Sequence, residues 1–108
     1  MDALEQYDVC IGLQRAGNTA QSVEMLHKMT VDFPDFPLVY NALAAFYKKE
    51  NNLESAIEHM EKYCALEPED AFGFSVLSSY CIALGRREQA EEALARAGEL
   101  RFRAQFGG

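Results

Sequence analysis

The chain has 108 residues, of which 49% are hydrophobic, 11% aromatic and 25% charged, a balance typical of one folded globular domain and not of a disordered chain. Its formal net charge of -7 argues against nonspecific binding to nucleic acid or anionic membranes, because such binding needs clustered Lys and Arg. The sequence has no apolar run of about 18 residues that would predict a membrane-spanning helix and no secretory-signal pattern, so a cytoplasmic location is predicted.

Apolar periodicity, together with start and stop signals, predicts six helices. Pro37 suits the first position of a helix because its backbone nitrogen needs no partner there. Asp70 would place its carboxylate at the positive end of a helix, and Asn18 or Thr19 and Asn52 are the expected caps of two others. The helices are expected at about 3–15, 19–32, 37–50, 53–65 and 71–84, with the sixth beginning near Arg87 and having no stop before Gly107.

The chain also aligns with itself at a spacing of 34 residues. Between the two apolar segments of each unit stand Gly17, Asn51 and Gly85, residue types that tolerate the left-handed backbone found after a helix. Pro34 and Pro68 stand where the second helix of the first two units must stop. Each unit is therefore predicted to be a helix, a tight turn and a second helix. The apolar residues that recur in register are Val9, Leu43 and Leu77, then Leu13, Tyr47 and Cys81, then Leu26, Met60 and Leu94.

This pattern resembles the tetratricopeptide repeat family, whose 34-residue unit has an aromatic residue, Leu, a small residue, Tyr, Ala, a bulky residue, Ala and a closing Pro at set places. The middle unit matches best. The first unit has Gln6 at the aromatic place and Ser22 at an alanine place, and the third has Phe102 where the proline should be. The matching residues of the middle unit are Tyr40, Leu43, Ala44, Tyr47, Ala56, Met60, Leu66 and Pro68.

The resemblance implies an all-α fold, a right-handed α-solenoid of three helix-turn-helix repeats with six helices, and the sequence predicts no separate capping helix after them. It implies a single domain over 1–108, with repeats at about 3–36, 37–70 and 71–104. Paired helices must then approach closely at small residues. Those available are Ala44, Ala56, Ala90, Ala93 and Ala97, with Ser22 and Ser78 also small enough.

In this family the first helices of successive repeats line a concave groove that binds an extended peptide or a helix of the partner. The resemblance therefore implies an apolar protein or peptide partner, with an acidic residue selected by Arg15, Lys48 and Lys49. These lysines also end a helix, where a cation is favoured by the helix dipole without any ligand. The groove residues implied are Leu4, Tyr7, Ile11, Arg15, Leu38, Asn41, Ala45, Lys48, Lys49, Phe72, Ser75 and Ser79.

Some family members grip the carboxylate end of a chaperone tail with lysine, arginine and asparagine side chains. At the matching positions this sequence has residues that cannot donate a charged hydrogen bond. Chaperone-tail binding is therefore not expected. The residues at those positions are Tyr7, Ile11, Ala42, Phe72 and Val76.

No enzymatic chemistry is predicted. His27 and His59 fall at different places in the unit, so they do not meet by repeat symmetry, and they are interpreted as lone surface residues. Cys10, Cys64 and Cys81 lie in predicted helices among apolar neighbours and are expected to be reduced structural thiols. No cofactor and no metal ion are expected, because the sequence has no HxxxH, CxxC or Gly-rich phosphate-loop spacing.

The end of the sequence departs from the family, whose arrays usually finish with a polar capping helix. Leu100, Phe102 and Phe106 follow the third repeat and are the predicted residues of self-association. Three explanations stay open: a homo-oligomer, a longer parent chain and a self-packed tail. The function predicted first is a non-catalytic protein–protein interaction module, and the alternative is a self-assembling scaffold that oligomerises through its C-terminal helix.

Overall fold

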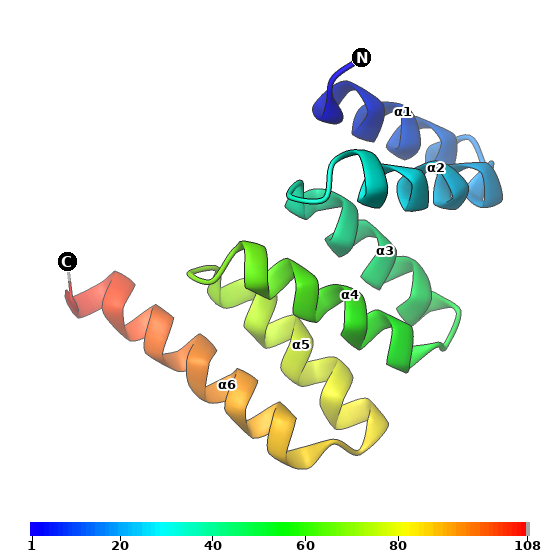
Figure 1. Cartoon of the computed structure of the whole chain (residues 1–108). Coiled ribbons are helices and arrows are strands. Elements are labelled where there is room, and N and C mark those ends of the chain that lie inside the picture. The colour runs from blue at the N-terminus through cyan, green and yellow to red at the C-terminus, as the bar shows by residue number, and fades with distance from the viewer. Residues whose placement is uncertain (108) are drawn as a thin grey trace.

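The computed structural model describes residues 1–107, and its α-helices form three successive pairs (Figure 1). A π-helical segment, Arg103–Gly107, continues the last helix. The predicted helices are confirmed: the ends of the first five differ by at most one residue from those expected, and the sixth begins at Arg87 as expected, with its α-helical part ending at Phe102. The helices are α1 (Ala3–Arg15), α2 (Thr19–Asp32), α3 (Pro37–Lys49), α4 (Leu53–Leu66), α5 (Ala71–Leu84) and α6 (Arg87–Phe102).

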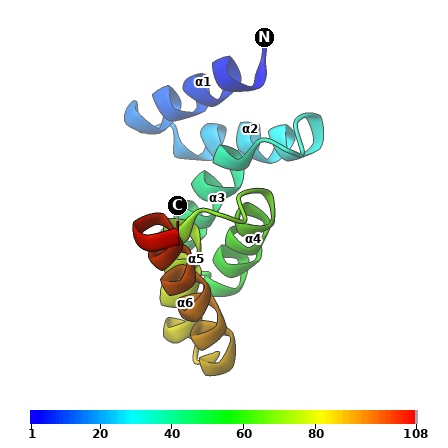
Figure 2. The same ribbon diagram turned by 90° about the vertical axis from the view of Figure 1, so that its left-hand side faces the viewer.

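The three helix pairs stack in chain order. Each helix packs on the one that follows it, so the α1–α2 pair lies at one end of the molecule and the α5–α6 pair at the other (Figures 1 and 2). The stack measures 40 × 33 × 23 Å. This is the predicted all-α solenoid. Within residues 1–107, no helix has the length and apolar character needed to cross a membrane.

The turn inside each pair has the predicted left-handed residue. The φ angles are 86° at Gly17, 59° at Asn51 and 84° at Gly85. In each turn the residue that follows donates its backbone N–H to a carbonyl five residues earlier, and all three N···O distances are 2.8 Å. This bond satisfies a carbonyl that the end of the helix would otherwise leave unpaired. The three turns are therefore equivalent in structure as well as in sequence.

Most of the expected helix caps are present. The Asn52 side chain accepts from the Ser55 backbone N–H at 3.2 Å, and Asp70 accepts from the Phe72 N–H at 3.0 Å. Asn18 occupies the cap position of α2, but its side chain makes no capping bond. The cap of α1 was not predicted: Asp2 and Glu5 form a reciprocal capping box there.

The helices of each pair approach closely at two equivalent small residues. In the first pair these are Cys10 and Ser22, and the Ser22 hydroxyl donates to the Cys10 carbonyl at 2.8 Å. In the third pair the serine is on the other helix, where Ser78 donates to the Ala90 carbonyl at 2.9 Å. Both serines are buried, so the two departures from alanine are accommodated by a hydrogen bond across the pair.

Two buried clusters form the core. One joins the first and second helix pairs through Cys10, Leu26, Met29, Val39 and Leu43. The other joins the second and third pairs through Ala44, Ile57, Met60, Cys64, Leu77, Cys81, Ala90 and Ala93. The three cysteines are free and buried. Burial raises the pKa of each thiol, that of Cys64 to about 11, which makes them unreactive core residues.

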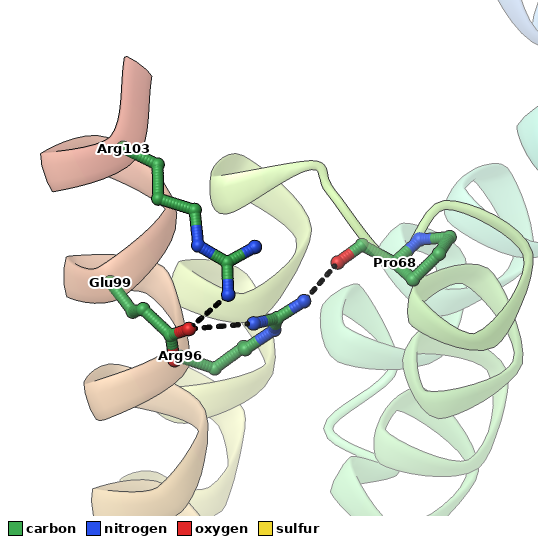
Figure 3. Close-up of polar contacts among 4 residues, drawn as sticks. All are labelled: Pro68, Arg96, Glu99 and Arg103. Carbon is green, nitrogen blue, oxygen red and sulfur yellow. Dashed lines mark hydrogen bonds and ion pairs between the residues drawn. The ribbon is translucent and has the colours of Figure 1, made fainter. Parts of the chain in front are cut away.

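A cation over an aromatic ring recurs in two pairs. Lys62 lies over the Tyr40 ring, and Arg96 lies over the Phe74 ring, each 6.0 Å from the ring centroid. Arg96 also donates to the Pro68 carbonyl at 3.2 Å and pairs with Glu99 (Figure 3). Arg96 thereby fixes α6 to the loop that connects α4 and α5.

Candidate binding groove

A groove lies between α1 and α3 and has a volume of about 540 Å³. Six of the twelve predicted groove residues line it, and they come from both helices. The groove also includes Gln14, Thr19, Ala42 and Phe46. The six predicted residues that meet here are Tyr7, Ile11, Asn41, Ala45, Lys48 and Lys49.

One wall of the groove is held in place by aromatic packing. Tyr7 packs edge-on against Phe36, with ring centroids 6.0 Å apart. Burial raises the pKa of Tyr7, so its phenol is neutral at physiological pH and offers both a hydrogen-bond donor and an acceptor. On the other wall, Phe46 packs edge-on against Tyr47 at 5.1 Å. These contacts preorganise the apolar walls before any ligand enters.

One end of the groove is positively charged. Lys48 and Lys49 stand exposed in the last turn of α3, and no carboxylate lines the groove. Because the chain as a whole carries a charge of -7, this end is locally opposite in sign to the rest of the protein. Asn41 adds an amide that can both donate and accept a hydrogen bond. The arrangement suits an apolar segment that ends in an acidic group.

The other six predicted residues lie outside this groove. Leu4, Arg15, Leu38, Phe72 and Ser79 are exposed elsewhere. Ser75 is engaged within the chain, since its hydroxyl accepts a hydrogen bond from the Arg101 guanidinium at 2.5 Å. Phe46 of α3 and Thr19 of α2 also line the groove and were not predicted. No periodic signal in the sequence marks these two residues, because their place depends on how the helices pack.

One residue of the predicted self-association site is not available. Leu100 is buried, because it continues the apolar stripe of α6 that faces the rest of the molecule, formed by Ala90, Ala93 and Ala97. The prediction that Leu100 contributes to an exposed contact is therefore wrong. Phe102 and Phe106 are exposed, and their rings contact each other with centroids 5.0 Å apart.

The two histidines do meet, contrary to the prediction. His27 Nε2 lies 2.7 Å from the Tyr47 hydroxyl, and the His59 ring stacks on Tyr47. The two imidazole centroids are 6.0 Å apart. Repeat equivalence is not needed for this contact, because Tyr47 lies between α2 and α4 and gathers both rings. His59 Nδ1 is 2.7 Å from the Ser55 carbonyl and donates to it.

Residues 1–107 contain no group of three or more His, Cys, Asp or Glu side chains gathered as they would be around a metal ion.

Comparison with known proteins identifies the repeat. Residues 38–70 match the sequence profile of the tetratricopeptide repeat, which is the unit that the sequence analysis found most regular. No curated protein matches the chain significantly.

Several solved structures share the fold. A double mutant of MamA RS-1 has a TM-score of 0.83 and 22% identity over 97% of this chain. A MamA structure from Desulfovibrio magneticus RS-1, residue 41 to the end, gives 0.80 and 22% identity over 95%. This chain spans 58% of the length of each of these two MamA chains.

A third similar structure is the second tetratricopeptide repeat domain of Spaghetti (RPAP3), bound to the HSP90 peptide SRMEEVD. It has a TM-score of 0.77 and 17% identity, and the match covers 91% of both chains. At these identities the likeness shows the fold. Residues 38–70 therefore match one tetratricopeptide repeat by sequence, and this repeat is flanked by two helix pairs of the same architecture.

Proposed function

We propose that this protein is a non-catalytic interaction module that binds an apolar segment of another protein, ending in an acidic residue, in the groove between α1 and α3. The observation that carries the proposal is a single cavity of about 540 Å³ with apolar and aromatic walls, two lysines at one end and no lining carboxylate. The peptide held by the RPAP3 domain supports this use of the fold. Chaperone tails are not the proposed ligand, because the clamp positions carry Tyr7, Ile11, Ala42, Phe72 and Val76.

A library of ten-residue peptides displayed on phage tests the proposal. Selection on the purified protein should enrich apolar sequences with Asp or Glu at one end. Binding of a selected peptide, measured by fluorescence polarisation, should fall at least tenfold in the Lys48→Glu/Lys49→Glu variant, because reversing both charges repels the acidic residue. The SRMEEVD peptide should bind no better than a scrambled version.

The control is Lys28→Glu, a single charge reversal away from the groove. Lys28 is exposed on α2 and lies beside a different surface hollow, so its reversal changes the net charge without touching the groove. Equal loss of binding in both variants would indicate general electrostatic attraction and would refute the groove assignment. Unchanged affinity in Lys48→Glu/Lys49→Glu would move the binding site elsewhere.

A cytoplasmic location is part of the proposal. The three buried cysteines are free, as expected for a protein that folds in a reducing compartment.

Self-assembly is a second candidate function. The last helix pair and the segment that follows it expose five large apolar side chains, and such exposure favours association. These side chains are Phe72, Ile82, Leu94, Phe102 and Phe106.

A further inference from the structure

The outer face of the last helix pair contains an open hollow between α5 and α6. Its volume is about 360 Å³. Two large apolar side chains border it and are mostly in water: Ile82 is 65% exposed and Leu94 is 55% exposed. Ser78 and Ala90, the close-approach residues of this pair, form part of its lining.

The inner helix pairs show what covers the same face elsewhere in the stack. In the 34-residue register Leu94 corresponds to Met60 and Leu26, which are 1% and 0% exposed. Met60 shares a buried cluster with Leu77 of α5, and Leu26 shares the other cluster with Leu43 of α3. At both inner junctions, therefore, the first helix of the next pair covers this position.

Helix α1 presents the other half of such a junction. Val9 corresponds to Leu43 and Leu77, which are 0% and 7% exposed, yet Val9 is 40% exposed. Leu13, one turn later, corresponds to Cys81, which lies in the same cluster as Leu77. Val9 and Leu13 thus stand at the positions whose equivalents fill the inner junctions.

We propose that α1 of a second copy of this chain docks onto the α5–α6 face of the first. Val9 and Leu13 of the second copy enter the hollow beside Leu94. The contact joins unlike faces, so it repeats head to tail and builds an open assembly. This inference rests on the second candidate function, self-assembly, and is independent of the groove between α1 and α3.

The contact is weaker than the inner junctions. Arg87 and Glu91 line the hollow where the second pair has Leu53 and Ile57. Covering these charged groups removes part of their hydration, which offsets the gain from burying apolar surface. Association is therefore expected at high micromolar concentration and is to be measured at physiological salt.

Site-directed cross-linking of the full chain tests the arrangement. A short bismaleimide should join Leu94→Cys to Val9→Cys when the two variants, distinguished by a tag, are mixed at high concentration. Neither variant alone should cross-link above wild type, whose buried thiols set the background. Val31→Cys replaces Val9→Cys as the control, because Val31 is 78% exposed on α2.

Sedimentation equilibrium provides the second measurement. Leu94→Asp should reduce association at least tenfold, whereas Val31→Asp and the groove variant Lys48→Glu/Lys49→Glu should leave it unchanged. If Leu94→Cys by itself cross-links as fast as its mixture with Val9→Cys, the contact is symmetric and the head-to-tail arrangement is overturned. If only Phe102→Ser/Phe106→Ser abolishes the concentration dependence of the mass, the contact lies at the end of the chain instead. A strict monomer would refute both this contact and self-assembly, with the groove proposal unaffected.

Discussion

At the scale of single residues, the close approach of two helix pairs is concentrated at Gly73. A Cβ atom added there would lie 2.8 Å from Cε1 of Tyr63. That ring cannot move freely, because its hydroxyl donates to Asp70 at 2.5 Å, a bond that also raises the pKa of Tyr63 to about 12. Asp70 in turn caps α5 through the Phe72 N–H. Gly73 is therefore required by packing, since its backbone is an ordinary helix.

We expect Gly73→Ala to destabilise the protein. Overpacking costs about 1–3 kcal/mol, whereas the higher helix propensity of alanine contributes only about 1 kcal/mol in the opposite direction. Gly12→Ala is the matched control, because nothing lies within 4 Å of the added Cβ in α1, and it should stabilise the protein. Urea unfolding followed by circular dichroism gives both values. An equal stabilisation by the two substitutions would mean that Tyr63 swings aside at little cost.

At the scale of elements, the junction between the first two helix pairs contains a group that titrates near neutral pH. Burial lowers the pKa of His27 below its ordinary value of 6.5, and His59 of the neighbouring pair lowers it further. A pKa lowered by folding means that the unfolded chain binds a proton that the folded protein excludes. The stability from this group is therefore complete above pH 6.5 and is lost as the pH falls through 6.5 toward the folded-state pKa.

We expect the unfolding free energy to fall between pH 7.5 and 5.5, and to fall less in His27→Gln. Glutamine retains a hydrogen-bonding group for Tyr47 but does not titrate. Comparison of the two pH profiles in urea isolates this contribution, since the carboxylates are common to both proteins. Parallel profiles for wild type and His27→Gln would show that the imidazole is not excluded from protonation in the folded state.

At the scale of the whole molecule, the sequence predicts features that depend on near neighbours better than those that depend on how helices cross. The left-handed turn at Gly17, the first position of Pro37 and the cap at Asn52 are each decided within a few residues, and all three are confirmed. The 34-residue register also predicts apolar positions that are found in the two buried clusters.

The errors arise where distant elements meet. The contact of His27 with His59 depends on the position of Tyr47 between two helix pairs. The burial of Leu100 depends on which side of α6 faces the other helices. In the groove, Phe46 joins Tyr7 only because of the angle between α1 and α3. None of these is encoded in the spacing of one unit, so the fold was predictable and the extent of the site was not.

The two ends of the stack should also differ in stability. Helix α1 contributes one fully buried residue, Cys10, whereas α4 contributes Ala56, Ile57, Met60 and Cys64. In a linear array each helix pair is stabilised only by its neighbours, so α1 has the least buried surface to lose on opening. We therefore expect amide hydrogen exchange to be fastest in α1 and slowest in α4.

Leu26→Ala provides the perturbation that tests this gradient. Leu26 is fully buried in the cluster shared by the first two helix pairs, and its truncation should cost about 2–5 kcal/mol at that junction. Exchange should then accelerate strongly in α1 and α2 and much less in α5 and α6, as measured by mass spectrometry of peptic fragments. Uniform acceleration along the chain would instead show that the three helix pairs unfold as one cooperative unit, in which the junction at Leu26 is no weaker than the junction at Met60.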